Sequence, residues 1–148
     1  MALREIRKIG DDVLKKKCRK VEVFDKKLET LIEDMIDTMY EAEGVGLAAP
    51  QIGVLKQVVV IDIGDENGVY VLINPEIISQ KGSQIDDEGC LSIPGVFDKV
   101  ERPNIVTVRF QNIKGDHYEL TGEEFLARAI CHEVDHLNGT LFVERVSK

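Results

Sequence analysis

Apolar residues recur at the spacing of a helix face in a stretch near the start of the chain. They stand three or four positions apart, at Leu28, Leu31, Ile32, Met35, Ile36 and Met39. This spacing predicts an amphipathic helix with its apolar side against a core. Asp25 is a residue type that caps a helix start, and Gly44 is a type that ends one.

A second helix is predicted from about Thr121 to Leu137. Its start has the T-x-x-E pattern of a capping box, formed by Thr121 and Glu124. Asn138-Gly139 is typical of a helix end.

Between the two helices the chain is rich in Val and Ile, which is typical of strands. Strand-like segments are found at 57–63, 69–74, 76–80 and 104–110. Their spacers are too short for the crossovers that parallel strands need, so antiparallel pairing is expected. The predicted fold class is α+β: antiparallel β-sheets packed around a central C-terminal helix, plus an N-terminal amphipathic helix.

The length of 148 residues suits one domain over residues 1–148. Apolar residues make up 43% of the chain, but no run approaches the roughly 20 that a membrane helix needs. The start also lacks the apolar run of a signal peptide. The expected location is therefore the cytoplasm, with no membrane partner.

The chain has 19 basic and 27 acidic residues, a net charge of −8. This balance argues against a broad nucleic-acid-binding face, and DNA is not an expected partner. The exception is the basic run from Lys15 to Lys20, Lys-Lys-Lys-Cys-Arg-Lys. It fits a solvated surface, and the alternative is a weak contact with RNA.

The strongest chemical signal is His132-Glu133-Val134-Asp135-His136, in the predicted C-terminal helix. Residues four apart lie on one helix face about 6 Å from each other, so two imidazoles there can share a metal ion. Glu133 is rotated by roughly 100° from His132, which suits a hydrogen bond to a metal-held water better than a third ligand. H-E-x-x-H on a helix therefore predicts two metal ligands and a general base.

A chance match on a helix with polar residues is the alternative. The stripe Phe125, Ala129, His132, His136 places both histidines on a predicted core-facing side. Burying two histidines and a glutamate without a task would be costly, which favours the metal interpretation.

A third ligand has to come from another part of the chain. Three widely spaced cysteines do not suggest a disulfide framework, and Cys18 and Cys131 fit small buried apolar residues. Cys90 follows Gly89, which would let the backbone turn sharply. A thiolate is a strong ligand for Zn²⁺ or Fe²⁺, so Cys90 is a better candidate than His117, in a predicted strand.

The stretch from Gly44 to Gln51 reads Gly-Val-Gly-Leu-Ala-Ala-Pro-Gln. Its small residues allow another backbone to approach closely, but taken alone the stretch favours a tight connector followed by a strand. Gln51 is its one side chain able to donate hydrogen bonds.

Together these three pieces resemble the peptide deformylase family, which has G-x-G-L-A-A-x-Q, E-G-C-L-S and H-E-x-D-H in this order. Here the motifs occupy 44–51, 88–92 and 132–136, and every fixed position matches. The resemblance spans nearly the whole chain. It implies a single catalytic domain over residues 1–148, a hydrolase that removes the formyl group from the N-terminal formyl-methionine of nascent polypeptides and releases formate.

The resemblance implies one divalent metal ion held by Cys90, His132 and His136, with water as a fourth ligand. Glu133 would be the general base and then the general acid. Fe²⁺ is the metal expected from the family, with Zn²⁺ or Ni²⁺ as alternatives.

The resemblance implies further roles around this metal. The side-chain amide of Gln51 and the backbone N–H of Leu91 would face the developing oxyanion. Glu88 would be a buried carboxylate behind the ligands, with Arg102 as its partner.

The methionine side chain of the substrate needs an apolar pocket. Val45, Phe125 and Ala129 are the candidates, because the last two share the ligand face of the predicted helix. The substrate backbone would pair with the strand edge at Val45-Gly46. The alternative is that these side chains belong only to the core.

The expected partner is an N-formylmethionyl peptide, with transient ribosome association. The chain ends soon after Leu141-Phe142, so docking through the longer C-terminal tail of some members is not expected. Other functions fit parts of the pattern: a structural metal module, a thiol hydrolase using Cys90, or an H-E-x-x-H endopeptidase. Structural sites usually have four protein ligands, and only three converge here by pattern.

Overall fold

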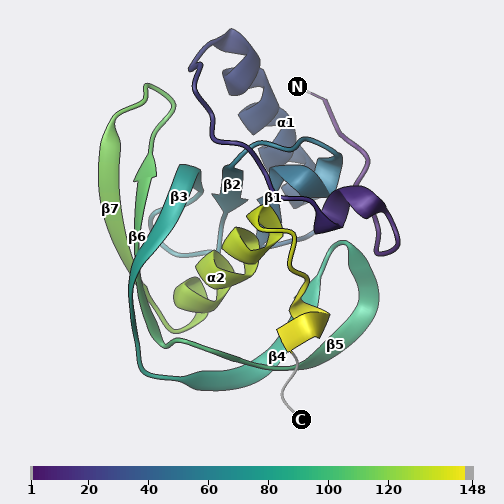
Figure 1. Ribbon diagram of the computed structural model, residues 1–148, viewed down its shortest axis with the longest axis vertical. Helices are drawn as coiled ribbons and strands as arrows, with labels where there is room; N and C mark the ends of the chain where they lie inside the picture. Colours follow the sequence, from purple (N-terminus) through teal and green to yellow (C-terminus); the bar gives the residue numbers. More distant parts are fainter. Residues whose placement is uncertain (1, 146–148) are drawn as a thin grey trace.

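Two antiparallel sheets, two α-helices and three short 3₁₀ turns form the part of the chain that the computed structural model describes, residues 2–145 (Figure 1). The elements are η1 (Asp12–Lys15), α1 (Lys26–Glu41), β1 (Gly46–Ala48), η2 (Ala49–Ile52), β2 (Val58–Ile61), β3 (Tyr70–Lys81), β4 (Gln84–Cys90), β5 (Ile93–Arg102), β6 (Ile105–Gln111), β7 (His117–Glu123), α2 (Phe125–Leu137) and η3 (Phe142–Arg145). Among these residues no helix is long and apolar enough to cross a membrane.

The larger sheet has the strand order β1-β2-β3-β6-β7, and every neighbouring pair is antiparallel. The hairpin β4–β5 forms a separate two-stranded sheet. Figure 1 shows α2 at the centre of the molecule, with β6 and β7 to its left and the hairpin below and to its right. The predicted α+β class, with antiparallel sheets around a central C-terminal helix, is confirmed.

Helix α2 is central because it is apolar on most of its surface. Ala127 and Ile130 are fully buried and belong to the core cluster that contains Val59, Val106 and Val108 of the larger sheet. Burial of such side chains stabilises the fold by about 1.5–3 kcal/mol each for the larger ones. The helix bearing the two histidines is thus fixed inside the core.

The predicted start of this helix at Thr121 is wrong. Thr121 lies in β7, opposite Thr107 of β6, and the two hydroxyl oxygens are 2.9 Å apart. The helix begins only after Glu124, which has φ 55° and makes no side-chain cap bond. Pairing with β6 keeps Thr121 extended, so the T-x-x-E pattern forms no capping box. The predicted end is confirmed, with Asn138 at the C-cap.

Helix α1 begins where Asp25 accepts a hydrogen bond from the Leu28 N–H, 3.1 Å long. Its apolar face packs in a second core cluster with β1 and β2. At its end Glu43, with φ 58°, takes the left-handed conformation that was expected at Gly44. Gly44 is instead needed for space, because a Cβ there would lie 2.6 Å from Leu91 Cδ1.

One strand, β3 (Tyr70–Lys81), takes the place of the two strands predicted at 69–74 and 76–80. A register shift interrupts its pairing with β6, and Asn74 has φ 52° there. The Asn74 side chain accepts a hydrogen bond from the Val21 N–H and donates one to the Gln111 side chain, which compensates the irregularity. The pattern of apolar residues does not predict the acidic strand β4, because only Glu88 among its seven residues is buried.

Candidate active site

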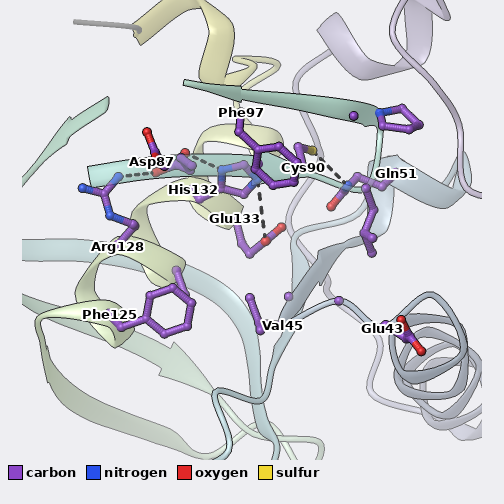
Figure 2. Close-up of a pocket in the computed structure, with 18 residues that line it drawn as sticks. Glu43, Val45, Gln51, Asp87, Cys90, Phe97, Phe125, Arg128, His132 and Glu133 are labelled. Carbon is purple, nitrogen blue, oxygen red and sulfur yellow. Dashed lines mark hydrogen bonds and ion pairs between the residues drawn. The ribbon is translucent and has the colours of Figure 1, made fainter. Parts of the chain in front are cut away.

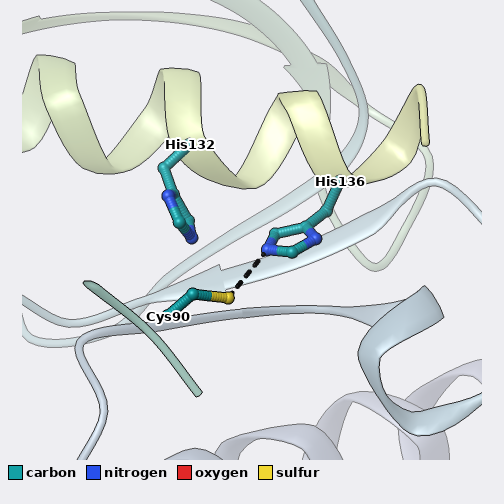
Figure 3. Close-up of side chains that lie close together, drawn as sticks. All are labelled: Cys90, His132 and His136. Carbon is teal, nitrogen blue, oxygen red and sulfur yellow. Dashed lines mark hydrogen bonds between the residues drawn. The ribbon is translucent and has the colours of Figure 1, made fainter. Parts of the chain in front are cut away.

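The structure brings the three predicted metal ligands together. Cys90 is the last residue of β4, and His132 and His136 lie one turn apart on α2 (Figure 3). One ligand atom from each lies within 4.8 Å of the others, and Cys90 Sγ is 3.3 Å from His136 Nε2. No fourth histidine, cysteine or carboxylate joins this group within residues 2–145. Such an arrangement leaves one position of a tetrahedral site open.

This donor set fits a divalent transition metal. A thiolate and two imidazoles are ligands that bind Zn²⁺ and Fe²⁺. Burial alone would lower the pKa of His132, but the Glu133 carboxylate and the hydrogen bonds with Cys90 and Glu88 outweigh burial and raise the pKa to about 10. An environment that favours positive charge at this point also favours a cation among the three donors.

Glu88 is buried and lies directly behind His132. Its Oε2 is 2.6 Å from His132 Nδ1 and also accepts from Arg102 Nη2, while Oε1 accepts from Arg102 Nε. Burial raises the pKa of Glu88, but the hydrogen bonds of His132 and Arg102 outweigh it and lower the pKa to about 2. The ionised carboxylate accepts from Nδ1, so Nε2 of His132 is the nitrogen that a metal would bind, in place of the Nε2 proton.

Asp135 and Arg128 complete this buried network, and the sequence pattern indicated a role for neither. Arg102 Nη1 donates to Asp135 across 2.6 Å. Arg128 Nη1 donates to Glu88 Oε1 across 2.8 Å. The signal for Arg128 was present, because it stands four positions before His132 on the same helix face, where a cation requires a buried partner.

Glu133 is buried beside the proposed ligands. Its Oε2 is 3.9 Å from His132 Nε2, and Oε1 has no hydrogen-bond partner in the described part of the chain (Figure 2). Burial is the largest influence on this group and raises the pKa of Glu133 to about 7. A carboxyl group with such a pKa can both accept and release a proton near neutrality.

Gln51 lies in η2, and its side chain reaches Cys90, one of the three converging donors. Its Oε1 accepts from the Ala48 N–H, and its Nε2 lies 3.1 Å from Ser92 Oγ and 3.6 Å from Cys90 Sγ. The first bond fixes the amide so that its donor side faces Cys90. Leu91, which follows Cys90, lines the same cavity.

Gly89 does not make the sharp turn that was expected of it. It lies within β4, and a Cβ there would stand only 2.4 Å from a ring atom of Phe97. Its role is to let this ring lie against the strand. Phe97 is 72% exposed and lines the cavity, a position that the sequence pattern did not indicate.

The cluster opens into a cavity of about 390 Å³. All four residues predicted to bind substrate line it: Val45, Gly46, Phe125 and Ala129. Figure 2 shows Val45 and Phe125 near Glu133 on one side of the cavity. Both side chains are about half exposed, so they are not purely core residues.

The remaining candidates lie away from the cluster. Cys18 and Cys131 are buried in the core around α2, and burial raises the pKa of Cys18 to about 11. His117 is exposed at the start of β7. Among the residues that the structure describes, none of the three belongs to the group of converging donors.

Comparisons with known proteins agree with this geometry. Residues 3–148 match the family model for polypeptide deformylase. A peptide deformylase of Clostridium botulinum (strain Alaska E43 / Type E3) is 60% identical over 148 residues, covering 100% of this chain and 99% of that protein. One from Alkaliphilus metalliredigens (strain QYMF) is also 60% identical, over 148 residues.

Solved structures show the same fold. The crystal structure of peptide deformylase from Thermotoga maritima matches with a TM-score of 0.96 at 44% identity, covering 99% of each chain. The enzyme from Synechococcus elongatus, in complex with actinonin, matches with a TM-score of 0.94 at 46% identity, covering 98% of this chain and 79% of that one. The chain therefore belongs to the polypeptide deformylase family, the metal-dependent enzymes that remove the N-formyl group from nascent polypeptides.

Proposed function

We propose that this chain, as one catalytic domain over residues 1–148, holds its metal with Cys90, His132 and His136 and uses Glu133 to transfer the proton. The supporting observation is the position of Glu133, a buried carboxylate with one unpartnered oxygen beside the three converging donors. When bound there, a divalent cation supplies Lewis acidity and lowers the pKa of a coordinated water towards about 7.

Glu133 accepts the proton of the attacking water while the oxygen adds to the formyl carbon. It then delivers that proton to the amine nitrogen of methionine as the C–N bond breaks, which releases formate. One carboxylate can perform both transfers because its pKa of about 7 lets it accept and release a proton near neutrality.

Gln51 Nε2 and the Leu91 N–H stabilise the negative charge that develops on the formyl oxygen. Both belong to segments next to Cys90, so their donors are held in place before the substrate arrives. Preorganised donors of this kind are typically worth about 2.7–4 kcal/mol each in barrier height.

The substrate backbone pairs with the free edge of β1. The Val45 carbonyl accepts from the Asp62 N–H on the β2 side, across 2.8 Å. The alternation of an antiparallel ladder then turns the N–H and C=O of Gly46 away from β2, and Gly46 lines the cavity. An extended peptide added at this edge places its methionine side chain among Val45, Phe125 and Ala129.

Fe²⁺ is the proposed metal, and Zn²⁺ and Ni²⁺ are the alternatives. The mixed thiolate and imidazole set suits all three ions, so chemistry alone does not select one. The test is anaerobic purification with elemental analysis, coupled to formate release from formyl-Met-Ala. One equivalent of iron together with turnover supports the proposal, whereas full metal content without amidase activity would favour a structural metal module.

We also propose that the enzyme works in the cytoplasm and associates transiently with the ribosome. The basic run from Lys15 to Lys20 supports the ribosome association, because its cations are exposed and form no ion pair within residues 2–145. Ribosome co-sedimentation at low and high salt tests the association. A variant with three of these lysines replaced by glutamine should no longer associate with the ribosome.

A further inference from the structure

The proposed metal ligands come from two separate parts of the fold. Cys90 belongs to the hairpin β4–β5, and both histidines belong to α2. The hairpin shares no strand pairing with the larger sheet. Side-chain contacts between hairpin and helix therefore contribute to the distance between the sulfur and the two imidazoles, beside the packing of Ile93 and Val100 against Leu141 and Phe142.

Arg128 makes three of these contacts from the helix side. It donates to Glu88 of β4 across 2.8 Å, to the Val100 carbonyl of β5 across 2.9 Å, and to the Gln84 side chain of β4 across 3.4 Å. Figure 2 shows its side chain extending from α2 towards the strand that carries Asp87. Arg128 is 3% exposed, so water does not compete for these bonds.

Arg102 makes the complementary contact from the hairpin side, because it lies on β5 and donates to Asp135 of α2. The two arginines therefore cross-link helix and hairpin in opposite directions, and both end on Glu88. Their two positive charges balance the two carboxylates, Glu88 and Asp135, within the buried network.

From these contacts we infer that Arg128 is a positioning residue for the metal centre: it clamps the β4–β5 hairpin onto α2 and so sets the separation of Cys90 from His132 and His136. The inference rests on the proposed ligand set. It assigns Arg128 no contact with the reacting atoms. Residues that orient metal ligands in this way typically contribute 10–100-fold to metal affinity.

A direct effect of the Arg128 charge on metal affinity would have the opposite sign to a positioning effect. Arg128 is a cation one helical turn from a ligand of a dication, so if it acted only through its charge, removing it would tighten metal binding. If it acts by positioning, removing it weakens binding. Metal affinity thus separates the two, and so does the geometry of the bound metal.

The test is titration of the metal-free protein with Co²⁺, in competition with a chelator, while the thiolate-to-cobalt charge-transfer absorption is recorded. We compare wild type, Arg128→Met, Arg128→Lys and the control Arg109→Met, which removes an exposed arginine of β6 paired with Glu119. Arg128→Met should bind Co²⁺ about 10–100-fold more weakly with a diminished sulfur band, Arg128→Lys should lie between it and wild type, and Arg109→Met should match wild type.

Binding by Arg128→Met that is tighter, or weaker by less than about fivefold, overturns the inference. If Arg128→Met does not fold, the same threshold applied to Arg128→Lys decides. A wild-type protein without the sulfur band would instead show that the proposed ligand set is wrong, so the two failures are distinct.

Discussion

The carboxylate of Glu133 occupies the space where any side chain on residue 46 would begin. A Cβ on Gly46 would lie 2.5 Å from Glu133 Oε2 and 3.0 Å from its Cδ. The glycine of β1 and the proton-transferring residue of α2 are therefore fitted to each other. The motif at 44–51 therefore leaves room for the Glu133 side chain of the motif at 132–136.

Gly46→Ala should fold but lose most of its activity. The atoms in the way are the flexible end of one side chain, so Glu133 can move aside at small cost in stability. A displacement of about 1 Å of a catalytic group can cost about 10²-fold in rate. Formate-release kinetics, with metal content and thermal unfolding as controls, test this. Wild-type kcat in the alanine variant would show that Glu133 needs no fixed position.

Glu133→Gln should keep the metal and lose turnover by about 10²–10⁴-fold, because an amide has the same shape but cannot accept the proton. Elemental analysis and formate release from formyl-Met-Ala measure the two properties separately. Glu144→Gln, at an exposed position in η3, is the control. A near-wild-type rate in Glu133→Gln would rule out the general-base role.

Cys90→Ala should release most of the metal, because it removes one of the three donors that converge in the described part of the chain. Cys131→Ala removes a thiol next to His132 in sequence that packs in the core, and it should retain the metal. Metal content after gel filtration distinguishes the two. A full equivalent in Cys90→Ala would exclude the sulfur as an essential ligand.

Gln51→Ala should lower kcat by about 10²–10³-fold with a smaller effect on KM, because its amide donates mainly to charge that develops during the reaction. Gln80→Ala, on the exposed side of β3, should have no effect. A rise in KM of about 10²–10³-fold with unchanged kcat would mean that Gln51 binds the substrate and the transition state equally well.

Asp34→Asn should destabilise the protein at neutral pH more than at acid pH. Burial raises the pKa of Asp34, but its hydrogen bonds with Arg4 and the Ala2 N–H outweigh burial and lower it. A lowered pKa in the folded state stabilises above the unfolded value near 3.8, and this contribution is lost as the pH falls through the folded pKa.

The difference should be roughly 1 kcal/mol at pH 7, because Arg4 is 36% exposed and solvent screens the pair. Urea unfolding at pH 7 and pH 3 measures it, with Asp37→Asn on the same helix as the control. The same loss of stability at both pH values would contradict a role for the charge.

The parts of the site that sequence could predict are those where one motif fixes the local chemistry. His132 and His136 are brought together by helix geometry alone, and Glu133 follows from the same geometry. The convergence of Cys90 with them depends on contacts between residues forty or more positions apart, which no local pattern encodes. It was reached through the family motifs, and the structure shows its physical basis in the network around Glu88.

The errors have specific physical causes. Thr121 was assigned to a helix because its local pattern matched a cap, but hydrogen bonds with β6 hold it in a strand. The sequence predicts a helix end at Gly44 and a sharp turn at Gly89, whereas both glycines allow close packing, against Leu91 and Phe97. Such packing partners are distant in sequence, so periodicity could not reveal them.

The free edge of β1 bears on how many different proteins one such enzyme can process. Main-chain groups are the same in every polypeptide, so a substrate held there is recognised without regard to the residues that follow its first side chain. Selectivity is then confined to the two features that all newly made bacterial chains share, the blocked amine and the methionine behind it. A three-residue strand would in this way let a single small hydrolase serve an entire proteome.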